Sequence, residues 1–411
     1  PSWNTLNIIL PVGISFYTFQ SMSYTIDVYY KKIAVERDFL RFATFISFFP
    51  QLVAGPIVRA SDFLPQFQKD REFNWDRFIA GTGQILWGFF KKVAVADSLA
   101  PFVDQCFAEP GGFSSLHLLI GVIFYSFQIY CDFSGYSDIA IGLARLMGFD
   151  FPVNFRTPYF SKNFSEFWTR WHISLSSWLR DYLYIPIGGN RGGTKASWMV
   201  IVAFMLLSAA LTGWWWLWLA YAVLSVGLVG YMRQSEQNAL KLFAYMNLMV
   251  TMLLGGLWHG ASWAFVFWGF LHGFYLIVQR LAGPIWNRTL DAMRLPIWLQ
   301  NGMAIGIVYF FTCLAWIYFR APDFQIANEV ISGIYSLENF NFGSVINRFT
   351  VVKGFLLIGL LLAVEIADFR FSFYQVSLRS PVFRVLSFAT LLWLIAFFGS
   401  FGANSFIYFQ F

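Results

Sequence analysis

Charged residues are scarce in this chain of 411 amino acids: they make up 12% of it, against 58% hydrophobic and 21% aromatic residues. So little charge excludes an ordinary soluble domain and indicates an integral membrane protein. The net charge of +6 is less informative, because basic residues gather in short segments such as Lys31–Lys32, Lys91–Lys92 and Arg191–Lys195. We expect these segments to be cytoplasmic loops. A nucleic-acid partner is not indicated.

Cysteine is rare as well. The three cysteines, Cys106, Cys131 and Cys313, are far apart and lie in or beside apolar segments. This spacing predicts neither a disulfide framework nor a zinc site, so we interpret them as packing residues and predict no metal centre. A signal-peptide pattern is also missing, and the chain opens at Pro1 directly into a hydrophobic block. We therefore expect the natural protein to carry further spans before this sequence.

Long uncharged blocks are abundant. Five blocks contain no Asp, Glu, Lys or Arg, namely residues 1–26, 196–232, 242–279, 295–319 and 385–411. One bilayer crossing takes about 20 apolar residues. The second and third blocks hold 37 and 38 residues, so each is expected to contain two spans, or a span plus a re-entrant piece. With residues 113–131 and 354–364, the pattern predicts an all-α protein of roughly nine to eleven membrane helices.

Two shorter segments suit the membrane surface better. Phe42–Val58 is broken by Pro50, Gly55 and Pro56, which favours a re-entrant or interfacial segment over a crossing. Asp76–Ala94 is amphipathic and has two lysines near its end. It fits a helix in the interface or, equally, a solvated connector between spans.

The most polar stretch among these blocks runs from Phe164 to Gly193 and contains His172. Drawn as one helix, it has an apolar sector and two polar sectors. The apolar sector holds Trp168, Trp171, Leu175, Trp178 and Leu179. The first polar sector holds Thr169, His172, Ser176 and Arg180. The second polar sector holds Arg170, Ser174, Ser177 and Asp181. Only the apolar sector suits lipid. The helix is therefore predicted to line a water-filled or protein-buried cavity, where ionisable groups are functional candidates.

Two aspartates precede that stretch. Asp132 and Asp138 lie six residues apart around Tyr136, at the end of an uncharged segment. On a helix they would point about 120° apart, and Gly135 favours a turn between them. Shared metal ligation is therefore disfavoured, and capping or hydrogen bonding to the backbone is the preferred interpretation. Asn154 follows in a loop that leads into the stretch around His172.

A second histidine, His259, lies near the middle of the block 242–279, preceded by Trp258. Gly255, Gly256 and Gly260 allow close backbone approach or a break in the helix, which would open space for a substrate beside the imidazole. His172 and His259 therefore predict one site assembled from two helices. We interpret His272, thirteen residues on, as a hydrogen-bonded structural group, and His117 has no comparable setting.

Between the two histidines lie a loop and a predicted hairpin. The run from Gly188 to Gly193 includes Asn190 and Arg191, but it has no Walker spacing and no strand before it, so we interpret it as a cytoplasmic turn. The block 196–232 carries Gly213 followed by three tryptophans, which predicts a membrane hairpin with aromatic residues at its turn.

Several long motifs occur in an order that resembles one family. They are FFPQLVAGPIVR, YCDFSGYSDIAIGLA, NFRTPYFSKNFSEFWTRWHISLSSWLRDYLYIPIGGNRGG, LLGGLWHGASW and a C-terminal FIYFQF. Together they resemble the membrane-bound O-acyltransferases, and within them the bacterial alginate O-acetylation membrane proteins, over nearly the whole chain from about residue 8. The resemblance implies a single membrane domain over residues 1–411, with helices around a central intramembrane cavity. It also marks 196–232 as an inserted hairpin, because members of this branch usually have a shorter connection there.

The resemblance further implies a chemistry. The essential histidine of the family lies in the LWHG motif, which corresponds to His259 here. A second functional histidine of the family lies in WHISLS, which corresponds to His172. The implied activity moves an acetyl group from a cytoplasmic thioester, such as acetyl-CoA, towards an exopolysaccharide such as alginate. The implied partners are the bilayer, the acyl donor, the polysaccharide and a periplasmic esterase-like transferase, with no permanent cofactor. The implied location is the bacterial inner membrane.

Our hypothesis makes His259 the general base, and His172 a group that positions the acceptor or donates to the oxyanion. Arg170, Arg180 and Asp181 would anchor a donor phosphate or pair with one another, and pairing is favoured because unpaired charges in a bilayer are costly.

Two alternatives stay open at this point. One is transfer of another acyl group, D-alanyl or fatty acyl, to a cell-wall polymer, lipid or peptide. The other is a transporter or channel in which His172, Arg170 and Asp181 relay or gate a solute. Many transporters carry two related halves, and the sequence holds no second copy of either histidine motif.

Overall fold

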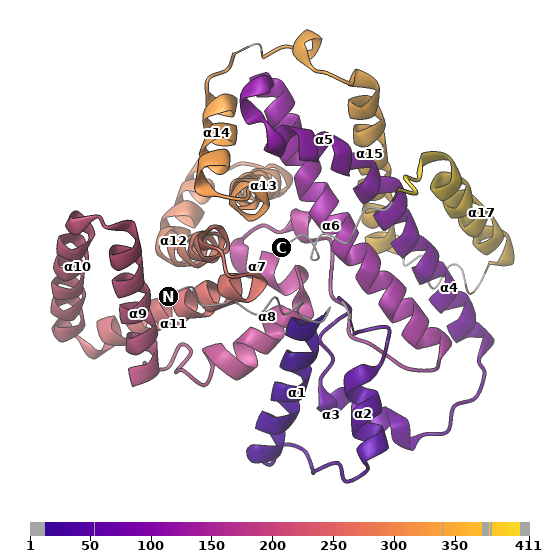
Figure 1. Cartoon of the computed structure of the whole chain (residues 1–411), viewed down its shortest axis with the longest axis horizontal. Coiled ribbons are helices and arrows are strands. Elements are labelled where there is room, and N and C mark those ends of the chain that lie inside the picture. Colours follow the sequence, from indigo (N-terminus) through magenta and orange to yellow (C-terminus); the bar gives the residue numbers. More distant parts are fainter. Residues whose placement is uncertain (1–12, 53, 339, 372–377, 379, 403–411) are drawn as a thin grey trace, which may run out of the picture. The chain divides into compact units, whose positions relative to one another are not determined.

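The computed structural model describes residues 13–402 apart from positions 53, 339, 372–377 and 379. Among these residues every regular element is a helix, which confirms the all-α prediction (Figure 1). The start of the block 1–26 and the C-terminal FIYFQF motif lie outside the described residues. The helices form two compact units.

The first unit comprises residues 1–157, 172–174 and 328–411. Its helices are α1 (Ile14–Tyr29), α2 (Phe39–Ser47), α3 (Ala60–Phe63), η1 (Leu64–Gln68), α4 (Trp75–Phe89), η2 (Phe90–Ala96), α5 (Asp97–Ala108), η3 (Pro110–Gly112), α6 (Ser115–Leu146), η6 (Phe342–Ser344), α15 (Arg348–Phe371) and α17 (Pro381–Phe398). The helices α4, η2 and α5 follow one another without a loop, and α6 packs along them (Figure 1). The segment 76–94 is therefore part of a longer helical run packed on protein.

The second unit comprises residues 158–171 and 175–327. Its helices are η4 (Pro158–Phe160), α7 (Phe164–Arg170), α8 (Ile173–Leu179), η5 (Arg180–Tyr184), α9 (Lys195–Thr212), α10 (Trp215–Gln234), α11 (Glu236–His259), α12 (Trp263–Met293) and α13 (Ile297–Arg320). Helix α8 has its first two residues in the other unit, and α14 (Phe324–Tyr335) begins in this unit and ends in the other.

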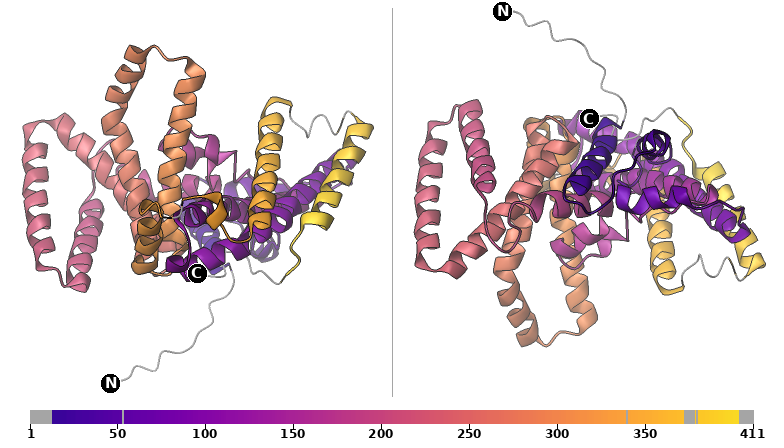
Figure 2. Two further views of the ribbon diagram at one scale, coloured as in Figure 1. Left: turned by 90° about the horizontal axis from the view of Figure 1, so that it is seen from above. Right: turned by 90° about the horizontal axis from the view of Figure 1, so that it is seen from below.

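Seven of the described helices are long and apolar enough to cross a membrane: α6, α10, α11, α12, α13, α15 and α17. The block 242–279 is divided between α11 and α12, as predicted. The block 196–232 is likewise a hairpin, in which α9 and α10 lie side by side and turn at Gly213, whose φ is +65° (Figure 2). The total of nine to eleven membrane helices stays a prediction.

Glycines allow α11 and α12 to touch. A Cβ atom on Gly256 would lie 2.3 Å from the carbonyl oxygen of Phe265, and one on Gly269 would lie 2.3 Å from that of Met252. Both distances are far below van der Waals contact, so any larger residue would push the helices apart. The prediction that glycines next to His259 permit close backbone approach is confirmed for Gly256.

A network of buried charges joins η2 to α6. Lys91 pairs with Asp138, and Lys92 pairs with both Asp132 and Asp97. The side chain of Lys91 is only 5% exposed, so the prediction that Lys91–Lys92 is a cytoplasmic loop is wrong. The π-helical turn η2 directs consecutive lysines towards aspartates that lie six residues apart on α6. The ion pairs make these charges tolerable in an apolar setting.

Helix α6 is also continuous from Ser115 to Leu146, so the predicted turn at Gly135 is wrong. A Cβ atom on Gly135 would lie 2.8 Å from the carbonyl oxygen of Gly88 on α4. The glycine therefore serves helix packing rather than a turn. Ion pairing also replaces the predicted capping role of Asp132 and Asp138, because the lysines approach them from the neighbouring helical run.

Lys92 is shared between Asp132 and Asp97, and it does not fully offset the cost of burying the Asp97 carboxylate. Burial raises the pKa of the Asp97 carboxyl from 3.8 to about 6, against the opposing effect of Lys92. Burial alone would lower the pKa of Lys92, but Asp132 and Asp97 outweigh it and the net direction is upward. Lys92 therefore stays protonated at neutral pH.

We predict that Asp97 makes stability fall as pH rises. Because its pKa is about 6 in the folded protein and 3.8 as the ordinary value, the folded state binds the proton more tightly between these values. The contribution is largest below pH 4 and is lost by about pH 6, on the order of 2 kcal/mol. Thermal unfolding of the wild type and Asp97→Asn in detergent should show this decline in the wild type only.

Asp104→Asn, at an exposed position on the same helix, is the matched control and should keep the wild-type pH trend. A stability difference between the wild type and Asp97→Asn that does not change from pH 4 to pH 6.5 would contradict the prediction.

Candidate functional site

The stretch around His172 is not one helix. Helix α7 ends at Arg170, α8 begins at Ile173, and His172 between them has a φ of +43°, in the left-handed region that non-glycine residues rarely adopt. The predicted continuous helix with three sectors is therefore wrong. Periodicity misses the break because its cause is distant: the backbone N–H of Ile173 donates to the backbone oxygen of Asn154 at 2.9 Å. Strain of this kind persists only where the surroundings enforce it, and it is frequent at functional sites.

The side chain of Asn154 holds this break together. Its Oδ1 accepts from the backbone N–H of Ser174 at 3.1 Å and from the Ser174 hydroxyl at 2.9 Å, and it lies 3.2 Å from Nδ1 of His172. Its Nδ2 donates to the hydroxyl of Ser137 on α6 at 3.1 Å. Asn154 is fully buried, so every one of these bonds forms away from water. Asn154 therefore fixes both the backbone and the imidazole at the break.

These bonds determine the tautomer of His172. Because Oδ1 of Asn154 already accepts from Ser174 and can only accept, Nδ1 of His172 must carry a proton to bond with it. A neutral His172 then has its lone pair on Nε2. Phe16, Phe133 and Phe155 surround the ring, with Phe133 edge-on at a centroid distance of 4.6 Å. His172 is thus held as an acceptor in an aromatic setting.

His259 lies at the last position of α11, where Gly260 ends the helix. Its ring contacts Trp258, Trp268 and Phe319 at centroid distances of 4.9, 5.0 and 5.1 Å. His259 is half-buried, unlike the buried His172. It therefore combines aromatic packing on several sides with partial exposure of the residue.

Two of the glycines around His259 are in tight contact with α12. A Cβ atom on Gly260 would lie 2.7 Å from the ring of Phe265, and Gly256 is in contact with α12. The predicted break of the helix is confirmed, because Gly260 ends α11. Space for a substrate beside the imidazole stays a prediction.

The predicted apolar sector faces protein rather than lipid. All five of its residues are buried, namely Trp168, Trp171, Leu175, Trp178 and Leu179. The assignment of this face to lipid is wrong, because the surrounding aromatic residues pack on it. Trp168 and Trp171 contact Phe167 and aromatic rings of α12 and α13.

The predicted charged residues of this stretch pair locally. Arg170 pairs with Glu166 at 2.7 Å, and Arg180 pairs with Asp181 at 2.7 Å. The hydrogen bond with Asp181 raises the pKa of Arg180. Ser176 donates its hydroxyl proton to the backbone oxygen of Trp168 at 2.6 Å. The predicted preference for pairing over phosphate anchoring is supported for Arg180 and Asp181. Arg170 pairs instead with Glu166, a partner that was not predicted.

The glycine-rich loop is ordered by a buried amide. Nδ2 of Asn247 on α11 donates to the backbone oxygens of Gly189 and Gly192, each at 2.9 Å, and its Oδ1 accepts from Ser197 at 2.7 Å. Gly188 and Gly189 have φ values of +121° and +54°, which a side chain would strain. The loop is thus a specific turn fixed to the helix that carries His259.

The structure therefore brings some predicted residues together. His172, Asn154 and Ser174 form one hydrogen-bonded cluster in the first unit, whereas Asp132, Tyr136 and Asp138 lie on α6 of that unit, with both aspartates in the charge network. His259 and Trp258 lie in the second unit. Within the described part of the chain, no group of three or more His, Cys, Asp or Glu side chains could hold a metal ion. Cys106, Cys131 and Cys313 are all buried, as predicted for packing residues.

Three residues around the histidines were not predicted. Trp268 and Phe319 contact His259, and Ser137 orients Asn154. Trp268 lies in the aromatic run after LWHG and Ser137 in the motif YCDFSGYSDIAIGLA, whereas Phe319 has no such signal.

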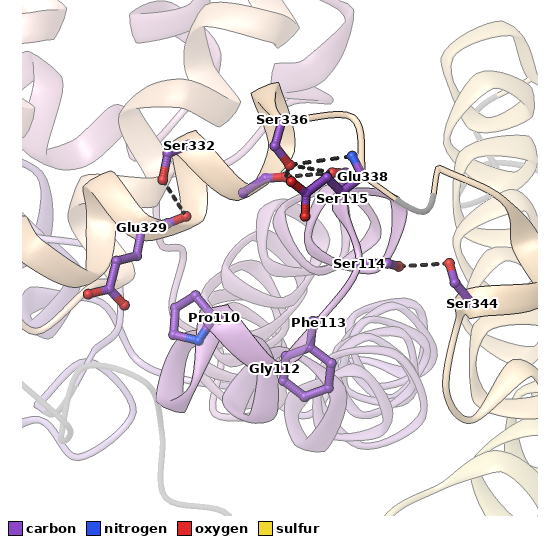
Figure 3. Close-up of a pocket in the computed structure, with 12 residues that line it drawn as sticks. Pro110, Gly112, Phe113, Ser114, Ser115, Glu329, Ser332, Ser336, Glu338 and Ser344 are labelled. Atoms are coloured by element: carbon purple, nitrogen blue, oxygen red, sulfur yellow. Dashed lines mark hydrogen bonds between the residues drawn. The ribbon is translucent and has the colours of Figure 1, made fainter.

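One cleft of about 540 Å³ lies at the start of α6 in the first unit (Figure 3). Serine hydroxyls line it, but they form hydrogen bonds between segments of the protein. Ser115 donates to the backbone oxygen of Gly333 at 2.6 Å, and Ser344 donates to Ser114 at 2.9 Å. None of the predicted site residues lines this cleft.

Comparison with known proteins agrees with the order of motifs. The profile of the MBOAT, membrane-bound O-acyltransferase family, matches residues 30–237. The probable alginate O-acetylase of Azotobacter vinelandii is 38% identical over 340 residues, which cover 81% of this chain and 55% of that protein. The peptidoglycan O-acetyltransferase of Helicobacter pylori is 33% identical over 363 residues, 82% of this chain and 59% of that protein.

A more distant relative transfers a different group. The teichoic acid D-alanyltransferase of Bacillus subtilis is 26% identical over 321 residues, which cover 78% of this chain and 71% of that protein. The chain spans little more than half the length of the alginate and peptidoglycan relatives. On the family profile and these identities, the chain belongs to the membrane-bound O-acyltransferase family, on the branch of the probable alginate O-acetylases.

Proposed function

We propose that this protein is an O-acetyltransferase that moves an acetyl group from a thioester to a hydroxyl of a polysaccharide. The observation that carries the proposal is His259, a half-buried imidazole at a helix end in a chain of this family. A general base has to be reached by the proton that it removes, and His259 is partly exposed whereas the other described histidines are buried.

In the proposed reaction His259 removes the proton of the acceptor hydroxyl. The acceptor oxygen bonds to the acyl carbon, the carbon–sulfur bond breaks, and the proton passes from His259 to the leaving thiolate. The products are an ester and a free thiol, so no oxidant or further reactant is needed. A neutral imidazole performs both transfers near neutral pH.

His172 is proposed to position the acceptor. With its Nδ1 proton committed to Asn154, a neutral His172 accepts a hydrogen bond at Nε2 and has no second N–H to donate. Of the two roles considered from the sequence, positioning an acceptor hydroxyl therefore fits better than donating to an oxyanion. Both histidines are proposed to serve the same transfer.

The names of the relatives support a proposal for the substrates of the reaction. We propose acetyl-CoA as the donor and an exopolysaccharide such as alginate as the acceptor, because relatives named as an alginate O-acetylase and a peptidoglycan O-acetyltransferase share more than 30% identity. We further propose a location in the bacterial inner membrane, where the acetyl group passes on through a periplasmic esterase-like transferase. The hairpin 196–232 is proposed as an insertion in a single domain over residues 1–411.

D-alanyl transfer is the second candidate, favoured by the 26% identity to a teichoic acid D-alanyltransferase. The two histidines serve either acyl group, so the acyl pocket has to discriminate between them.

We predict that His259→Ala abolishes acetyl transfer. Loss of a general base typically lowers the rate on the order of 10²–10⁴-fold. The measurement is acetylation of the polysaccharide by membranes supplied with labelled acetyl-CoA, together with a check that the variant is folded in the membrane. Leu257→Ala, an exposed position two residues away, is the matched control and should retain transfer. Acetylation by His259→Ala at the wild-type rate would contradict the role of His259 as general base.

We also predict that Asn154→Ala impairs turnover more than donor binding. The variant removes the oxygen that orients His172, so kcat should fall by on the order of 10²-fold while the KM for the thioester changes little. Ser137→Ala removes only the bond to Nδ2 of Asn154 and should lower kcat much less. An equal loss of kcat in both variants would contradict the prediction, because it would show that Asn154 acts through general packing and not through the orientation of His172.

A further inference from the structure

A cluster of buried aromatic residues surrounds His272 in the second unit. Its members come from α7, α12 and α13, and each is at most 7% exposed: Trp168, Trp268, His272, Tyr275 and Trp316. The ring of His272 lies 4.8 Å from Trp268, 5.1 Å from Trp168, 5.9 Å from Tyr275 and 6.4 Å from Trp316, between centroids. His272 is therefore the centre of the cluster.

The polar atoms of this cluster lack protein partners. Within the described residues, neither nitrogen of His272 has a hydrogen-bond partner, and the same holds for the three indole N–H groups and the Tyr275 hydroxyl. The prediction that His272 is a hydrogen-bonded structural group is therefore wrong. Leaving a buried polar group unsatisfied costs about 1–3 kcal/mol, and native proteins keep few of them. Several gathered around one imidazole point to a ligand.

The chemistry of the cluster restricts that ligand. Each indole only donates, the tyrosine hydroxyl donates, and a neutral imidazole donates through one nitrogen. The donors thus outnumber the acceptors, so the group that satisfies them must itself be an acceptor, such as a carbonyl oxygen. The rings are also in van der Waals contact with one another, for example Trp268 and Trp316 at 5.8 Å between centroids, so the group must be small.

The cluster adjoins the proposed base. Trp268 packs edge-on against His259 at 5.0 Å and against His272 at 4.8 Å, between ring centroids. Trp268 and His272 lie four residues apart on α12, on one face of the helix. A group held by the cluster would therefore lie against the same tryptophan that contacts His259.

We propose that the cluster around His272 binds the short acyl group of the thioester through its carbonyl oxygen, and that its aromatic walls limit the length of the acyl chain. This inference rests on the proposed function. The long chain of a fatty acyl group does not fit between rings in contact. D-alanyl offers the same carbonyl oxygen, but its ammonium group would add further donors to a cluster in which donors already outnumber acceptors. The cluster therefore selects acetyl.

The test is acyl selectivity of the full-length chain in detergent. The kcat/KM values for acetyl-, propionyl- and butyryl-CoA are compared in the wild type, Trp316→Phe and Tyr275→Phe. Trp316→Phe removes one donor and shortens a wall, so acetyl-CoA should lose about tenfold while butyryl-CoA loses less or gains. Tyr275→Phe removes only a hydroxyl and is the smaller perturbation, so it gives a result if Trp316→Phe fails to fold. It should lower kcat/KM for all three donors, with acetyl-CoA affected most.

Trp216→Phe makes the same change at an exposed position of α10 and should leave the selectivity at the wild-type value. A structural role for the cluster would lower stability and leave the ratio of the three donors unchanged, and that outcome would overturn the inference alone. A wild-type protein that transfers none of the three acyl groups, while folded, would overturn the proposed function and the ligand with it.

Discussion

The side-chain oxygen of Asn154 is the atom on which the geometry around His172 depends. It accepts from the backbone and the hydroxyl of Ser174 and from Nδ1 of His172, and all three residues are buried. In an apolar chain such bonds are strong, and their loss would leave several donors unsatisfied at once. Asn154 thereby keeps His172 in a left-handed backbone conformation and in a single tautomer.

The two units treat their buried polar groups differently. In the first unit, charges neutralise one another: Lys91 and Lys92 meet the aspartates of α6, and the Tyr130 hydroxyl donates to Glu365. In the second unit, the donors around His272 have no protein acceptor within the described residues. The first arrangement stabilises a helix interface. The second has the chemistry of a binding site, and it lies on the helix that packs against His259.

Much of this could be predicted from the sequence. Uncharged block length predicted the hairpin of α9 and α10 and the division between α11 and α12, because the bilayer fixes the length of a span. The motif order predicted the family, which the profile confirms. The break at His172 could not be predicted, because its cause is Asn154, eighteen residues earlier. Lys91–Lys92 resembled a loop since a periodic pattern does not reveal partners on another helix.

The central claim is that His172 and His259 serve one acyl transfer. The most direct measurement is a double-mutant cycle on kcat, with His172→Ala, His259→Ala and the double variant assayed under identical conditions. Groups that act as a unit show strongly non-additive losses, so the account predicts that the double variant is about as slow as the slower single variant. Losses that multiply, as for two independent sites, would contradict it.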